Sequence, residues 1–384
     1  MSKITQHELA RQLGVSRSTV AAALNPASTI KLNEETRQRI IEAAERLNYR
    51  PDRYARVMRG GRSGLIGILH FGGLLQVAAE RACHAAEAVR GAGYEVVAAD
   101  LSWASESVKA ACSSLLDARV EGVIVAGLNA PGAVVDLERL RLANLPVVTL
   151  SGNPLPWAPH FRGDTRRGIR DLTAHLIALG HRRLALMTHI SSGEEAPGAY
   201  VWAGTERRNG FEAGLKEAGG ALVPAFDSSR ARSRSLQGKP LGFVASTGLP
   251  RDPFDPFRPG LEAMRLLLQG PDRPTAVLCS NDEIAFGALQ ACREAGVAVP
   301  CDMAITGYDD IALGHYCDVP LTTVRQPNRA MAEAAVRMLI RLIGKEKIAQ
   351  KERLQLFPCE VILRASSGVA RSEASSATHS ASQS

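Results

Sequence analysis

The sequence lacks the features that mark several classes of protein. No uninterrupted apolar stretch approaches the roughly 18 residues that a membrane-spanning helix needs. Residues 1–8 lack the apolar core of a secretory signal, so we expect a cytoplasmic protein without a membrane partner. The seven cysteines are scattered and include no Cys-x-x-Cys pair. They indicate reduced, mostly buried side chains rather than a disulfide framework or a zinc site.

Motifs of common enzyme classes are also missing. Gly61, Gly64 and Gly67 do not have the dinucleotide-binding spacing, and the run begins before a strand pattern rather than after it. His175 and His181 are accompanied by neither a Gly-x-Ser-x-Gly elbow nor a His-Glu-x-x-His pair. We therefore expect no catalytic residues, no metal site and no cofactor.

Positive charge is concentrated at the front of the chain. Residues 1–62 contain 12 Lys/Arg and 6 Asp/Glu, a net charge of +6, whereas the remaining residues contain 34 and 33, a net charge of +1. A charged run is usually only a solvated face. A compact basic unit on a nearly neutral body instead indicates a polyanionic partner, most simply nucleic acid.

Composition divides the chain into four zones. Residues 1–50 show short helical patterns, and 51–63 form a basic connector that ends in a Gly-rich break. Residues 64–365 alternate strand and helix patterns. The whole chain is 45% hydrophobic, which is enough apolar material to form buried cores. Residues 366–384 are rich in Ser and Ala, so we expect a disordered tail.

The long third zone alternates short apolar runs with amphipathic segments. The predicted strands are Leu65–Leu69, Val123–Ala126, Pro146–Leu150, Leu184–Met187, Gly242–Ala245, Ala276–Cys279 and Met303–Thr306. The predicted helices, each followed by a glycine, are 76–90, 168–179, 206–218, 282–295 and 328–343. This alternation predicts an α/β fold with parallel, doubly wound sheets in two lobes. Ligands of such folds bind beyond the carboxyl ends of the strands.

The first zone predicts a helix, a tight turn and a second helix. Thr5 and Glu8 form a capping-box pattern that opens the first helix, and Gly14 ends it. Ser16 then caps a second helix over 17–24, and Asn33 precedes a third over 34–47. Any small helical bundle could show these signals. In this order they also match the arrangement that places a second helix in the major groove of DNA.

A resemblance decides between these two interpretations. The segments that carry it are Leu13-Gly14-Val15-Ser16-Arg17-Ser18-Thr19-Val20, Leu24-Asn25, Glu34-Glu35-Thr36-Arg37, Leu47-Asn48-Tyr49-Arg50-Pro51 and Ala55-Arg56. They closely resemble the headpiece of LacI/GalR-family transcription regulators, and the resemblance continues to Arg364. It implies an all-α headpiece followed by a two-lobe domain similar to periplasmic sugar-binding proteins, with three crossovers and a cleft.

The resemblance also implies roles in DNA binding. Arg17, Ser18 and Ala22 match base-reading positions, and on the helix Ser18, Ala22 and Asn25 are expected to point away from the core. Because alanine can only pack on a thymine methyl, base reading should fall mainly on Arg17. The expected DNA-contacting residues that position the backbone are Thr5, Ser16, Thr19 and Asn25.

The connector resembles the family's hinge helix. Met58 matches the apolar wedge that enters the minor groove, although it could instead be a linker residue that packs on the core. Arg53 and Arg56 are expected near phosphates or in the narrowed groove, which would make binding salt-dependent.

Four places match the family's ligand-contacting positions. Arg207 fits a cleft arginine, and Asp309 fits a residue that accepts ligand hydroxyls. Asn281 and Asp282 follow a predicted strand, and Asp164 begins a helix. Asp164 and Asp282 could equally be simple helix caps. Ser151 stands where many sugar-responsive relatives have aspartate.

We therefore expect a DNA-binding transcriptional regulator, most simply a repressor, controlled by a sugar or sugar acid. The first lobe is expected over 64–162 and 328–354 and the second over 163–327 and 355–365. A homodimer that pairs through the first lobe, with helix 76–90, would bind a pseudo-palindromic site on double-stranded DNA. The alternative is a cytoplasmic solute-binding module without a specific DNA target.

Overall fold

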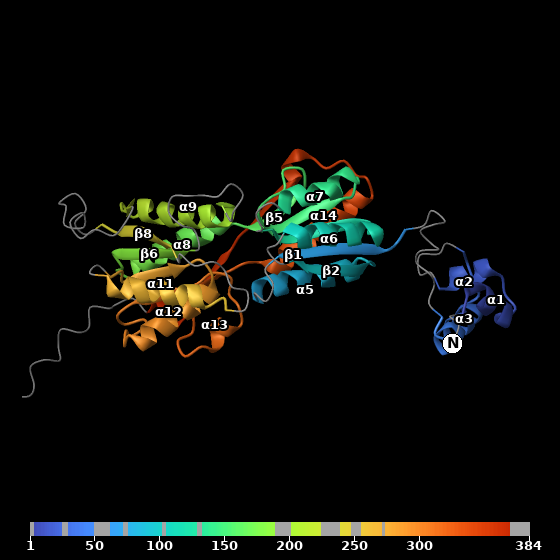
Figure 1. The fold of residues 1–384 in the computed structure, drawn as a ribbon, viewed down its shortest axis with the longest axis horizontal. Coiled ribbons are helices and arrows are strands. Elements are labelled where there is room, and N and C mark those ends of the chain that lie inside the picture. Colours follow the sequence, from blue (N-terminus) through green and yellow to red (C-terminus); the bar gives the residue numbers. More distant parts are fainter. Residues whose placement is uncertain are drawn as a thin grey trace, which may run out of the picture. The chain divides into compact units, whose positions relative to one another are not determined.

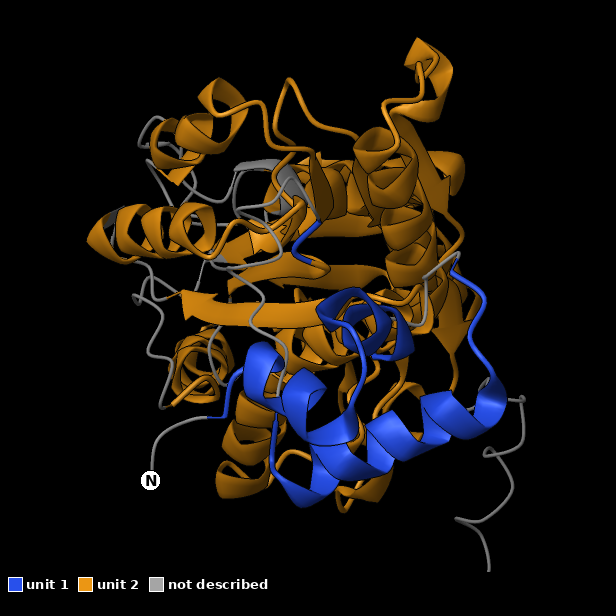
Figure 2. Cartoon of the chain, turned by 90° about the vertical axis from the view of Figure 1, so that its right-hand side faces the viewer, with its two compact units in different colours: residues 1–63 blue, residues 64–384 orange. Residues whose placement is uncertain are grey.

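The structure of this 384-residue chain is a computed structural model. It describes residues 4–24, 30–49, 62–71, 76–101, 105–128, 133–188, 201–223, 239–246, 255–270 and 273–368. The chain forms two compact units (Figure 2), which we call the front unit (Met1–Ser63) and the body (Gly64–Ser384).

The front unit contains three helices around a small core. Helix α1 (Gln6–Leu13) begins with the predicted Thr5–Glu8 capping box and ends at Gly14, which has a φ of +66°. Helix α2 (Arg17–Ala23) follows after a short turn, and α3 (Glu34–Arg46) completes the bundle. The core side chains are Leu9, Ala10, Val20, Ala23, Ile40, Ala43 and Ala44. The predicted helix-turn-helix is confirmed.

The first lobe of the body contains a parallel six-stranded sheet in the order β12-β5-β4-β3-β1-β2. Its strands are β1 (Leu65–Phe71), β2 (Glu95–Leu101), β3 (Gly122–Leu128), β4 (Val147–Gly152), β5 (His160–Gly163) and β12 (Leu354–Phe357). Strands β1, β2 and β5 are labelled in Figure 1. Side chains of α5 (Gln76–Gly91) and α14 (Asn328–Ile343) share one core, and those of α6 (Ser105–Asp117) and α7 (Ala133–Leu142) share another. Helices therefore bury both faces of the sheet.

The second lobe has a parallel five-stranded sheet in the order β10-β9-β6-β8-β7. Its strands are β6 (Arg183–Thr188), β7 (Ala221–Val223), β8 (Leu241–Ser246), β9 (Ala276–Cys279) and β10 (Ala304–Thr306). Helices α8 (Thr165–Ala178) and α9 (Val201–Glu217) pack on one core, and α11 (Arg258–Gln269) and α12 (Asp282–Glu294) pack on another. A short helix, α13 (Leu313–Tyr316), follows β10.

The chain passes between the two lobes three times. The passages lie between β5 and α8, between β11 (Thr323–Arg325) and α14, and between β12 and β13 (Glu360–Ile362). Strands β11 and β13 pair with each other in antiparallel fashion beside the passages. Together with the two parallel sheets, these passages confirm the predicted two-lobe α/β fold with three crossovers.

The strands that the sequence did not reveal are β2, β5, β7, β11, β12 and β13. All of them except β2 have only three or four residues. Strands β2 and β12 lie at the two edges of the first sheet, where several of their side chains are exposed. Strands this short or this exposed give only a weak apolar pattern, and this is why the sequence missed them.

The predicted start of the disordered tail at residue 366 is wrong. Ser366 and Ser367 are buried, and η2 (Ala365–Ser367) contains both. The Ser366 hydroxyl donates to the carbonyl of Ile305 and accepts from the backbone N–H of Thr322. Small polar side chains fit this site because the backbone of the second lobe supplies their partners. The ordered body therefore reaches at least Gly368.

No helix among the described residues combines the length and the apolar character needed to cross a membrane.

The cysteines are less buried than expected. All seven are free, but only Cys112, Cys279 and Cys292 are buried, while Cys83 and Cys301 are exposed. The expectation that the cysteines are mostly buried is therefore wrong.

Candidate functional site

The start of α2 is a network of small hydroxyl side chains. Ser16 caps the helix, because its Oγ accepts a hydrogen bond from the Thr19 N–H at 3.0 Å. The same Oγ lies 2.6 Å from Ser18 Oγ and 2.7 Å from Thr19 Oγ1. Gln6 of α1 donates to the carbonyl of Arg17 at 2.8 Å. These bonds fix the first turn of α2 against α1 while the serine side chains stay exposed.

Two of the three predicted base-reading positions lie on the surface. Arg17 and Ser18 are exposed at the start of α2. The expectation that Ala22 is also exposed is wrong, since its side chain is only 3% exposed. Helix α2 contacts both α1 and α3, so its buried positions Val20, Ala22 and Ala23 span about 160° of the helix rather than one narrow stripe.

Of the remaining predicted DNA contacts, only some lie among the described residues. Thr5 is exposed, and its backbone N–H and hydroxyl both donate to Glu8 Oε2. Asn25, Arg53, Arg56 and Met58 lie outside the described residues, so their roles stay predictions.

In the second lobe, Tyr308 lies at the centre of the predicted ligand-contacting residues. Its side chain is fully buried, and its hydroxyl lies 2.8 Å from Thr165 Oγ1 in the first turn of α8. The guanidinium carbon of Arg207, on α9, lies 4.5 Å from the centre of the Tyr308 ring. Arg207 Nε is a buried donor without a hydrogen-bond partner in the described structure. Burial raises the pKa of Tyr308 far above its usual value, so its hydroxyl stays protonated.

Asp309 joins the two lobes. It follows Tyr308 with a φ of +122°, a backbone region that residues with a side chain seldom adopt. Its Oδ1 accepts a 2.6 Å hydrogen bond from Gln326 Nε2 and lies 3.8 Å from Nη2 of Arg81, on α5 of the first lobe. Asp309 also lines a cavity of about 480 Å³ with residues of α5 and α14. A strained, 5%-exposed carboxylate at this junction makes Asp309 a candidate site residue, and its contact with a ligand stays a prediction.

Asp164 performs the capping role that the sequence left open. Its Oδ1 accepts the Arg167 N–H at 3.1 Å at the start of α8. Beside it, Arg162 at the end of β5 pairs with Glu206 at 3.5 Å. Burial lowers the pKa of Arg162, although Glu206 and Asp164 counteract this effect. Capping by one oxygen does not exclude ligand binding by the other, so Asp164 remains a predicted effector residue.

Asp282 turns its side chain into the second lobe, and its contact with a ligand stays a prediction. Its side chain is 0% exposed, and its oxygens accept from Thr323 Oγ1 at 2.6 Å and from the Ile311 N–H at 2.8 Å. A Cβ at Gly307 would lie 2.0 Å from Asp282 Oδ1, so the chain needs glycine there. The carboxyl turns inward because it satisfies backbone that would otherwise be buried without partners.

Asp282 therefore positions the loop that contains Asp309. Burial, with the charge of Asp309 second, raises the pKa of Asp282 to about 8. Its neighbour Asn281 is the N-cap of α12 and is 8% exposed, and its Oδ1 accepts the Ile284 N–H at 3.0 Å. Asn281 is thus used as a cap, and its contact with a ligand stays a prediction.

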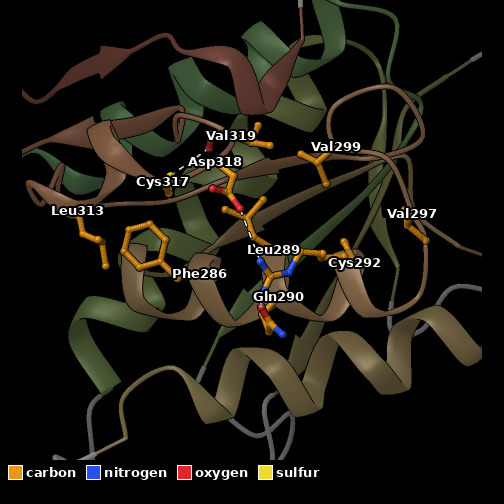
Figure 3. Close-up of a pocket in the computed structure, with 11 residues that line it drawn as sticks. Phe286, Leu289, Gln290, Cys292, Val297, Val299, Leu313, Cys317, Asp318 and Val319 are labelled. Atoms are coloured by element: carbon orange, nitrogen blue, oxygen red, sulfur yellow. Dashed lines mark hydrogen bonds and ion pairs between the residues drawn. The ribbon is translucent and has the colours of Figure 1, made fainter.

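A separate, largely apolar cavity of about 390 Å³ lies between α12 and the segment around α13 (Figure 3). Phe286, Leu289 and Val319 line it, and Asp318 pairs with Arg293 at 3.6 Å. No predicted site residue is among the described residues that line this cavity. Across the described ranges, no group of three or more His, Cys, Asp or Glu side chains could hold a metal ion.

Two family models match the two units. Residues 5–52 match "Bacterial regulatory proteins, lacI family", and 173–367, half of the chain, match "Periplasmic binding protein-like domain". The chain is a LacI-family regulator. It is a DNA-binding transcriptional regulator whose body has the periplasmic-binding-protein-like fold.

This LacI-family chain is similar to curated repressors over most of its length. It is 29% identical to the ribose operon repressor of Escherichia coli strain K12, over 92% of this chain and 97% of the relative. It is 27% identical to the repressor CytR of the same strain, over 94% and 96% of the two chains. A lac repressor dimer bound to operator and the anti-inducer ONPF has the same fold, with a TM-score of 0.74, 24% identity and coverage of 96% and 100%.

The sequence missed three polar residues of this candidate site. Arg81, Arg162 and Tyr308 were not predicted as site residues, yet each lies beside one that was. Tyr308 directly precedes Asp309 and Arg162 lies two residues before Asp164, so the ends of the strands could have revealed them. Arg81 lies on α5 in the first lobe, and no local pattern marks it.

Proposed function

We propose that this protein is a homodimeric transcriptional repressor whose hold on a pseudo-palindromic DNA site is controlled by a sugar or sugar acid. The observation that carries the proposal is the exposed pair Arg17–Ser18 on a capped α2, in a segment that matches the lacI family. Relatives with repressor names match nearly the whole chain. The effector would bind between the two lobes of the body.

On DNA, the two ends of the front unit have different tasks. Arg17 can donate two hydrogen bonds to a guanine edge, and Ser18 can add a weaker contact. Ser16 and Thr19 would hold the helix on phosphates. Arg53 and Arg56 would bind the backbone, and Met58 would unstack a base step in the minor groove.

A homodimer supplies the symmetry that such a site needs. We expect pairing through α5, where Gln76, Ala79 and Cys83 are exposed at helical spacing. The solved neighbour of the same fold is itself a dimer on operator. Changing Ala79 to Glu should shift the purified chain from dimer to monomer in light scattering, and a dimer that survives would place the interface elsewhere.

In the body, the effector would contact Arg207 and Asp309 first. The unpartnered Nε of Arg207 and the carboxylate of Asp309 are suited to ligand oxygens and hydroxyls. A ligand shifts the equilibrium between lobe arrangements only by its differential affinity. About 5.5 kcal/mol would move that equilibrium from 1:99 to 99:1.

A gel shift on the DNA around the protein's own gene tests the proposal. The full chain should retard a specific fragment at low salt, and deletion of residues 1–60 should abolish the shift. A thermal-shift screen of sugars and sugar acids should identify compounds that also change DNA binding. A chain that binds such compounds but no fragment would be a solute-binding module instead.

A further inference from the structure

Arg81 is a nearly buried cation that none of the predicted roles uses. It lies on α5, in the first lobe, and its side chain is 9% exposed. Its Nε donates to Asn328 Oδ1 at 3.2 Å, at the start of α14. This bond holds the base of the guanidinium within its own lobe, and the Nη atoms extend toward Asp309 of the other lobe.

Most hydrogen-bonding capacity of Arg81 is unused. A guanidinium has five N–H donors. One is used by Asn328, and the 3.8 Å separation from Asp309 Oδ1 is an ion pair too long for a hydrogen bond. Within the described part of the chain, Arg81 makes no other hydrogen bond or ion pair. Such unused N–H donors on a cation are suited to the two oxygens of an anionic group.

Asp309 does not complete Arg81. Its Oδ1 already takes a 2.6 Å hydrogen bond from Gln326, which is 7% exposed. Arg207, whose guanidinium lies over the Tyr308 ring, also keeps a buried Nε without a hydrogen-bond partner among the described residues. Two arginines from the two lobes therefore lie beside Tyr308 and Asp309 with unused donors.

We propose that Arg81 is an effector-binding residue and that the effector carries an anionic group, a carboxylate or a phosphate, which Arg81 binds. The remainder of the ligand is a polyol whose hydroxyls contact Asp309 and Arg207. The planar fork of arginine accepts the two oxygens of such a group side by side. The inference rests on the proposed function and narrows its effector from sugars in general to acidic ones.

Matched pairs of probes test this inference on the full-length protein. The pairs are gluconate with glucitol, glucuronate with glucose, and glucose 6-phosphate with glucose, each measured by calorimetry at constant ionic strength. The wild type should bind an anionic member at least about tenfold more tightly than its neutral partner. Comparing the carboxylates with the phosphate shows which group the site takes.

Variants connect that preference to Arg81. Arg81→Gln should weaken binding of the anionic probe by about 10–100-fold and change binding of the neutral partner by no more than about twofold. Arg139→Gln, at an exposed position of α7 in the same lobe, should behave like the wild type. If Arg81→Gln does not fold, Arg81→Lys keeps the charge without the fork and should lose about tenfold for the same probe.

The outcomes separate this inference from the proposed function. Equal binding of acids by Arg81→Gln and the wild type, preference for neutral members, or no binding of any acid by the wild type overturns the inference. In each of these cases, ligand-sensitive DNA binding would leave the repressor proposal intact. Conversely, acid binding that depends on Arg81 in a protein that binds no DNA supports the inference and overturns the repressor proposal.

Discussion

The front unit and the body hold their functional side chains in opposite ways. In the front unit, Arg17 and Ser18 are exposed on a helix whose ends are satisfied by local caps. In the body, Tyr308 and Asp309 are buried and bonded to groups from distant segments. A surface that meets DNA must keep its donors free. A site for a small molecule must instead be organised before the ligand arrives.

The largest expected difference between the units is in stability. A unit of 63 residues has about 3–9 kcal/mol of stability, and loss of a buried leucine costs about 2–5 kcal/mol. Leu9→Ala, in the core of the front unit, should therefore abolish DNA binding at 37 °C while the body keeps its melting transition. Calorimetry and gel shifts on the same sample measure both effects.

The matched control is Leu339→Ala in the larger core of the first lobe. It should lower the melting temperature of the body and leave DNA binding intact at 25 °C. If the front unit and the body unfolded in a single transition in either variant, the two units would not be independent, and the comparison would fail.

The second prediction concerns pH and applies only to the body. Burial raises the pKa of Asp282 to about 8, well above its unfolded value. The folded state therefore holds this proton more tightly, and its contribution is complete below the unfolded pKa and lost as the pH rises through 8. Between pH 5 and 8 the free energy of unfolding should fall by about 1.4 kcal/mol per unit from this group.

Asp282→Asn isolates this effect. The amide cannot titrate, but its oxygen can still accept from the Ile311 N–H, and its NH2 group can donate to Thr323 Oγ1 in place of the bond that Thr323 donates in the wild type. Urea unfolding at pH 5.5, 7.0 and 8.5 should therefore show a shallower pH dependence than the wild type. Asp318→Asn, at an 89%-exposed side chain, controls for the substitution itself. An unchanged slope in Asp282→Asn would mean that the buried carboxyl is ionised throughout.

The same contrast explains what could be predicted from the sequence. Caps at Thr5, Ser16 and Asn33 depend on partners two or three residues away, so local patterns predicted them correctly. The sequence correctly placed Asp282 just after strand β9, at the edge where ligands bind. It could not show that the side chain bonds to Thr323, because that residue lies 41 positions further along the chain. Arg81 meets Asn328 across 247 residues, and only the folded lobes bring them together.

The third prediction tests the exposed surface. Arg17→Ala should reduce discrimination between the specific site and a mutated site by about 1–3 kcal/mol, because a bidentate base contact is lost. Arg11→Ala removes an exposed charge from α1 and should weaken specific and nonspecific binding alike. Binding titrations on both DNAs provide the measurement, and unchanged discrimination in Arg17→Ala would assign base reading to other residues.

The smallest expected effect shows whether Asp164 is only a helix cap, like Ser16, or also an effector-binding residue, as proposed for Asp309. Both Asp164 and Ser16 cap a helix, so changing either to Ala should cost its own unit about 1 kcal/mol. Asp164→Asn keeps the capping oxygen and should leave the melting temperature nearly unchanged. If the carboxylate also accepts ligand hydroxyls, the same variant should weaken effector binding by about tenfold, because charged acceptors bind more strongly than neutral ones. Calorimetry with the effector found in the screen measures this loss. Unchanged effector affinity in Asp164→Asn would mean that Asp164 is only a helix cap, bonded to a backbone N–H three residues away as Ser16 is in the front unit.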